Sequence, residues 1–113
     1  MSTDTSRIPV FKEKSTSGGS ITSDPLDLSR CLRKTVYFKS NFAGNIYVDF
    51  YDEINQVWDQ VFAEKVESGE LYVNSFKDMF RRKSRVRFVK SGLGEALVYF
   101  CEIYAEGYSR SEY

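Results

Sequence analysis

The sequence predicts an all-β protein, an antiparallel β-sandwich of about seven strands with a flexible N-terminal arm. From position 29 onward, short apolar and aromatic runs alternate with turn residues at the spacing typical of sandwiches and barrels. Aromatic residues, which favour strands, make up 16% of the chain. No stretch of the domain combines helical periodicity with the length of a helix. An oligonucleotide-binding-type barrel is the alternative architecture, and 113 residues leave room for one core in either case.

Residues 1–28 are predicted to form the arm, and residues 29–113 the β-sandwich domain. The arm contains both prolines of the chain and a run of Ser, Thr and Gly at 15–20. Such a segment offers too little apolar surface to offset the entropy lost on ordering. Removing it is therefore expected to leave the melting temperature of the domain nearly unchanged. Its few apolar residues could still dock onto a neighbouring surface: Ile8, Val10 and Phe11.

The first two strands of the domain are expected at 35–39 and 46–51. Turn residues separate them, among them Gly44, which can supply a positive φ angle. The second strand alternates cleanly between apolar and polar residues, and this alternation is the strongest strand signal in the chain. It places Ile46, Val48 and Phe50 inward and Tyr47, Asp49 and Tyr51 outward.

Five further elements are expected after a hairpin loop: strands at 57–63 and 71–73, one helical turn at 75–80, and strands at 85–89 and 95–104. The spacing of Phe76, Met79 and Phe80 predicts the helical turn. Val86 and Phe88 alternate with arginines and are expected to point inward. The last segment is apolar on both faces, which is typical of a central strand.

The chain contains no histidine. This removes the usual general base, the usual partner of a Ser or Cys nucleophile, and the commonest metal ligand. We therefore expect no enzymatic activity, no cofactor and no metal site.

The sequence also bears on where the protein is kept. No window approaches the roughly 20 apolar residues of a membrane helix, and the first residues lack the apolar core of a secretory signal. The chain is expected to be made in a cytoplasm and to have no membrane partner. In that reducing compartment Cys31 and Cys101 are expected to be small buried thiols rather than a disulfide.

Charge is segregated along the chain although the net charge is zero. Between Asp49 and Glu70 there are seven acidic residues against one lysine, and between Phe76 and Lys90 seven basic residues against one aspartate. We favour the interpretation that the two blocks meet each other, within one subunit or between copies. The basic block could instead bind single-stranded nucleic acid, but the acidic block would offset much of that electrostatic gain.

The residues expected to form contacts between copies are outward tyrosines and members of the two charge blocks: Tyr47, Tyr51, Tyr72, Arg81, Arg82, Lys83, Arg85, Arg87, Asp59, Glu64 and Glu67. Exposed tyrosines suit protein interfaces. Together with Tyr99 and Trp58 they could instead form a platform for sugar rings. The single tryptophan is, however, expected to fill the core of the sandwich.

A loose set of features runs from Thr35 to Gly107. They are the aromatic strand at 36–38, the turn into the strand at 46–50, a hairpin leading to Trp58, the Arg-rich strand at 85–89, and a Ser-Gly turn before the last strand. This order resembles the small β-sandwich domains of tailed-virus virion proteins, such as head decoration, tail and fibre components. The resemblance implies a non-catalytic structural role in a symmetric assembly, located in the virion, with the arm reaching a neighbour.

The leading hypothesis is a structural or assembly protein that packs in multiple copies and contacts copies of itself and other structural proteins. A carbohydrate-binding or receptor-binding module is the alternative. A single-stranded nucleic-acid binder is the third hypothesis.

Overall fold

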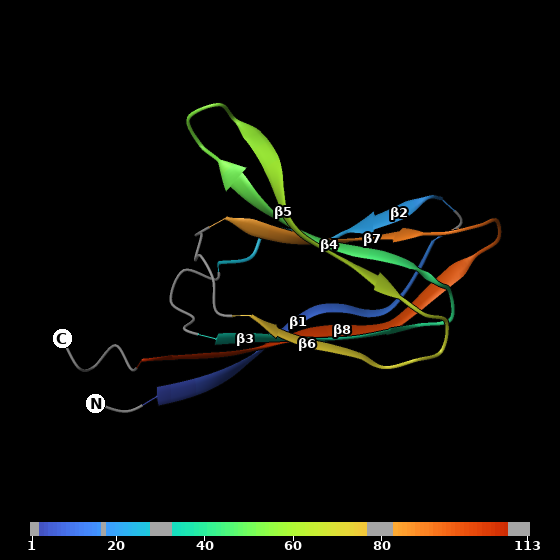
Figure 1. The fold of residues 1–113 in the computed structure, drawn as a ribbon, viewed down its shortest axis with the longest axis horizontal. Coiled ribbons are helices and arrows are strands. Elements are labelled where there is room, and N and C mark those ends of the chain that lie inside the picture. The colour runs from blue at the N-terminus through green and yellow to red at the C-terminus, as the bar shows by residue number, and fades with distance from the viewer. Residues whose placement is uncertain (1–2, 17, 28–32, 77–82, 109–113) are drawn as a thin grey trace.

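A computed structural model describes residues 3–16, 18–27, 33–76 and 83–108. These residues form eight strands in two antiparallel sheets that face each other (Figure 1). The first sheet has the order β1 (Thr3–Thr16), β8 (Ala96–Tyr108), β3 (Arg33–Ser40), β6 (Tyr72–Phe76). The second sheet has the order β2 (Ser20–Thr22), β7 (Ser84–Lys90), β4 (Gly44–Asp52), β5 (Val57–Val66). The predicted all-β sandwich is confirmed.

The strand alternation correctly predicts the core. Ile46, Val48 and Phe50 of β4 are buried, as are Val86 and Phe88 of β7. The first sheet covers them with buried residues of β3 and β8: Val36, Phe38, Val98, Cys101 and Ile103. The rings of Phe38 and Phe88 join the two sheets, with centroids 5.0 Å apart.

The prediction of a flexible arm is wrong for the described part of residues 1–28. Residues 3–16 form β1, which is antiparallel to β8 from Thr3 opposite Tyr108 to Thr16 opposite Ala96. Phe11 is buried in the core, and Ile8 and Val10 pack against it. The apolar residues expected to dock onto a neighbour therefore dock onto the chain's own core. An edge strand needs few apolar residues of its own, because hydrogen bonds to β8 and one buried ring offset the entropy of ordering.

The structure also corrects three local predictions. Ser75 and Phe76 end β6 rather than begin a helical turn, and the rest of that predicted turn lies outside the described residues. Trp58 is only half-buried and lies outside the core. Gly44 does not have a positive φ, which the described glycines show at 69, 92 and 94. Gly44 is needed for a close approach to β7 instead.

Cys101 is a free, buried thiol, as expected, whereas Cys31 lies outside the described residues. Burial raises the pKa of Cys101 to about 12. This thiol stays protonated at neutral pH and behaves as a small apolar side chain.

Strands β1 and β8 each contain a β-bulge, the one in β8 opposite β3 and the one in β1 opposite β8. Opposite β3, the register passes from Phe100 to Val98, so Tyr99 is an extra residue in β8. Opposite β8, the register passes from Pro9 to Phe11, so Val10 is an extra residue in β1. Because a bulge shifts the alternation by one, Tyr99 and Phe100 both lie on the outer side of the first sheet.

Candidate functional site

The outer face of the second sheet carries a buried carboxylate between two arginines. Asp49 of β4 points outward, as predicted, yet it is only 1% exposed. Its Oδ2 accepts hydrogen bonds from Arg85 Nε at 2.8 Å and from Arg87 Nε at 2.6 Å, and its Oδ1 accepts one from Arg87 Nη2 at 3.1 Å. Both arginines come from β7, the strand that pairs with β4.

These contacts keep Asp49 ionised. Burial alone would raise the pKa of the carboxyl group, but the hydrogen bonds from Arg87 and Arg85 outweigh burial and hold the pKa below its usual value. The same pairing raises the pKa of Arg87.

Three cations of this face also lie over aromatic rings. The guanidinium of Arg85 lies 4.3 Å from the ring centroid of Trp58, and that of Arg87 lies 4.5 Å from the ring of Tyr47. Lys83 Nζ lies 4.1 Å from the ring of Tyr51. Such cation–π contacts hold long side chains flat against the sheet. The rings on this face are covered by protein cations.

Replacing Asp49 by Asn is expected to lower the free energy of unfolding by about 2 to 3 kcal/mol at neutral pH, because two partly buried guanidinium groups lose their counter-charge. The folded-state pKa of Asp49 lies below its unfolded value of about 3.9, so its contribution is present above that pH and is lost as pH falls through the folded pKa. Urea unfolding between pH 7 and pH 2 should show the difference between parent and variant shrinking with acid. Asp59→Asn, on an exposed side chain, is the control. A difference that is independent of pH would contradict this assignment.

The structure places the described members of the eleven predicted interface residues on different surfaces of the domain. It brings together Tyr47, Tyr51, Lys83, Arg85 and Arg87 on the outer face of the second sheet. The acidic and basic blocks therefore meet within one subunit, at Asp49. Arg81 and Arg82 lie outside the described residues.

The other predicted residues lie away from this face. Asp59 and Glu64 are exposed on the edge strand β5, and Glu67 follows it, 3.9 Å from Lys65 Nζ. Tyr72 lies on β6 of the opposite sheet. Burial, with a smaller contribution from Glu64, raises the pKa of Tyr72 to about 12.

The outer face of the first sheet carries an apolar stripe that the sequence reasoning missed. We define the apolar stripe as Tyr37, Leu71, Val73 and Tyr104. Tyr37 and Tyr104 meet edge to face with ring centroids 5.0 Å apart, and Val73 lies directly opposite Tyr37. Val73 is 48% exposed and Leu71 is 55% exposed. The alternation in β3 could have placed Tyr37 outward, but its neighbours come from two distant strands.

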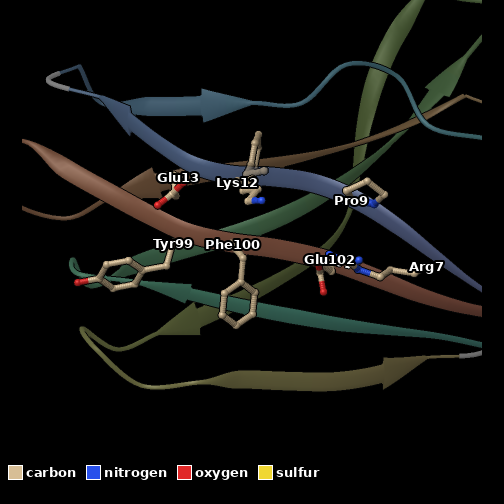
Figure 2. A pocket seen from close by; sticks show the side chains of 8 residues that line it. Arg7, Pro9, Lys12, Glu13, Tyr99, Phe100 and Glu102 are labelled. Atoms are coloured by element: carbon tan, nitrogen blue, oxygen red, sulfur yellow. Dashed lines mark hydrogen bonds and ion pairs between the residues drawn. The ribbon is translucent and has the colours of Figure 1, made fainter.

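An open groove of about 600 Å³ lies beside the stripe, over β1 and β8 (Figure 2). Its walls include Arg7, Pro9, Lys12, Tyr99, Phe100 and Glu102. Arg7 Nε donates a hydrogen bond of 2.8 Å to Glu102 Oε2, and Arg7 Nη2 bonds the same oxygen. The groove thus combines the rings of Tyr99 and Phe100 with an ion pair whose arginine is exposed.

The described residues also bear on metal sites and on membrane spans. Within the described residues, no group of three or more His, Cys, Asp or Glu side chains is placed to hold a metal ion. The part of the chain that the structure describes also contains no helix long and apolar enough to span a membrane.

No family model and no curated protein matches the chain. Among solved structures, it is similar to the SPBc2 prophage-derived protein YomS, with a TM-score of 0.57, 12% identity and coverage of 95% of this chain and 96% of that one. A protein of the disulfide-linked pili that form Bacillus endospore appendages gives a TM-score of 0.55 at 16% identity, covering 96% and 88%. The CBM36-1 domain of a multidomain xylanase from the hindgut metagenome of Trinervitermes trinervoides gives 0.53 at 8% identity, covering 94% and 99%.

At these identities the similarity establishes the fold alone. The neighbours include a prophage-derived protein and an appendage protein, which agrees, at the level of the fold, with the resemblance to phage-type structural β-sandwiches.

Proposed function

We propose that this chain is a non-enzymatic structural module that packs in multiple copies within a larger particle, as a virion component does. The observation that carries the proposal is the apolar stripe, where the half-exposed Val73 lies opposite Tyr37, whose ring contacts that of Tyr104. Leu71, two residues before Val73, is also half exposed. Contiguous exposed apolar and aromatic residues on a sheet face are typical of protein interfaces.

The partner in this proposal is a second copy of the chain. None of the four residues of the stripe is charged, so the surface is complementary to itself and does not need a partner of opposite charge. The neighbouring hydroxyl groups of Thr35 and Ser75 hydrogen bond to each other at 2.7 Å. Covering this face would therefore leave these two groups satisfied.

The fold of the pilus-forming appendage protein supports the proposal, because it gives an example of this architecture in a multi-copy assembly. The absence of histidine supports a non-enzymatic role. Arg85 and Arg87 are already bound to Asp49, so the proposed contact lies on the first sheet rather than on the charge blocks. The same pairing weakens the hypothesis of nucleic-acid binding.

Val73→Lys is expected to weaken self-association at least about tenfold, because a twofold contact would place two lysines near each other in an apolar interface. Sedimentation velocity over a concentration series measures this effect. Val57→Lys is the matched control, since Val57 is a strand valine of nearly equal exposure, 47%, on β5. A parent chain that stays monomeric throughout, or equal losses in both variants, would contradict the proposal.

A further inference from the structure

We propose that the groove over β1 and β8 binds a neutral saccharide. The site lies at two β-bulges, one in β8 opposite β3 and one in β1 opposite β8. The extra residue in β8 places Tyr99 and Phe100 side by side on the outer surface, where Figure 2 shows both rings projecting from the same strand. On the β1 side, Pro9 and Lys12 line the groove on either side of the second bulge.

The exposed ring of Tyr99 provides a stacking surface. It is 40% exposed, and Phe100 extends the apolar surface beside it. The apolar C–H face of a sugar ring packs on such rings, as in other ligand sites where aromatic residues are combined with a few polar groups. The rings of Tyr47, Tyr51 and Trp58 are less suited, because Arg87, Lys83 and Arg85 lie over them. The sugar platform considered from the sequence is thus better placed at Tyr99.

The ion pair of Arg7 and Glu102 provides hydrogen-bonding groups of both kinds. A guanidinium has five N–H donors and a carboxylate has several acceptor positions. Both groups can therefore form further hydrogen bonds besides those between them. Arg7 is well exposed, with 61% of its side chain accessible. A sugar hydroxyl both donates and accepts, and it matches this pair.

The charge of the groove favours a neutral ligand. Arg7 and Lys12 are balanced by Glu13 and Glu102, all of which line the groove. A phosphate or sulfate group in the groove would therefore be repelled by as many carboxylates as there are cations to attract it. A neutral oligosaccharide loses no charge solvation and can bond to either sign.

The groove adjoins the apolar stripe, because Arg7 lies opposite Tyr104 in the pairing of β1 with β8. Val73, by contrast, lies on β6, at the opposite edge of the sheet from β1. Saccharide binding and self-association can therefore be tested with different variants.

The experiment is isothermal titration of the full chain with xylohexaose, cellohexaose and mannohexaose, with a heparin hexasaccharide as the anionic comparison, preceded by a glycan array. At least one neutral glycan is expected to bind with Kd below about 1 mM. Tyr99→Ala should weaken that binding at least about tenfold and Arg7→Gln at least about fivefold. Tyr47→Ala is the matched control on the other sheet, and it should bind like the parent. Val73→Lys should also keep binding.

Thermal unfolding verifies that each variant is folded. If Tyr99→Ala does not fold, Arg7→Gln alone tests the site, because Arg7 is largely solvent-exposed and its replacement should not disturb folding. Three results would overturn the proposal: no neutral glycan bound on the array or in solution, binding of the anionic hexasaccharide alone, or equal weakening by Tyr47→Ala.

Discussion

Deleting residues 1–16 is expected to abolish cooperative folding of the domain. The deletion removes β1 and leaves β8, a strand inside the first sheet, with an unpaired edge along the twelve positions that now pair. It also removes Phe11 from the core, and loss of a buried phenylalanine side chain alone costs about 3 to 5 kcal/mol against a total stability of about 5 to 15. Differential scanning calorimetry should show no transition, or one lowered by tens of degrees.

Two point variants make the same test without shortening the chain. Phe11→Ala should lower the free energy of unfolding by about 3 kcal/mol or more, whereas Lys14→Ala, an exposed position in the same strand, should change it by less than about 0.5. If the truncated chain melted at the same temperature as the parent, residues 1–16 would be an independent arm and the assignment of β1 to the fold would be wrong.

Gly44→Ala is expected to destabilise the protein by about 3 kcal/mol or more. A Cβ at this position would lie 2.3 Å from the carbonyl oxygen of Val89 and 2.9 Å from Cα of Lys90. Both contacts are with the backbone of β7, which cannot move without disturbing its pairing with β4. Chemical denaturation measures the loss.

Gly19→Ala is the control, because a Cβ there meets nothing within 4 Å. It should leave the midpoint of unfolding nearly unchanged. If both alanine variants unfolded at the same denaturant concentration, the close approach of β4 to β7 would be wrong.

The core strands could be predicted because their alternation is local. Ile46, Val48 and Phe50 point to one side of a strand whatever pairs with it, and the structure buries all three. The N-terminal strand could not be predicted in this way. Its few apolar residues are sufficient only because β8 supplies the ladder and the core supplies the packing around Phe11.

The candidate sites could be predicted only in part, because they depend on contacts between residues that are distant in the sequence. The two charge blocks do meet at Asp49, which Arg85 and Arg87 hold, but among the described residues Asp59 and Glu64 lie exposed elsewhere. The apolar stripe joins three strands that are distant in the sequence. The groove depends on the bulge at Tyr99, which breaks the alternation used to assign faces.

Hydroxyl-radical footprinting of the tyrosines, on dilute and on concentrated protein, tests the proposed contact between copies most directly. We expect the chain to associate as its concentration rises, and Tyr37 and Tyr104 to lose reactivity in step with association, because both lie on the apolar stripe. Tyr47 and Tyr51, on the outer face of the second sheet, should keep theirs. Protection of Tyr47 and Tyr51 with unchanged reactivity at Tyr37 and Tyr104, or no association at any concentration, would contradict the proposed role of the first sheet.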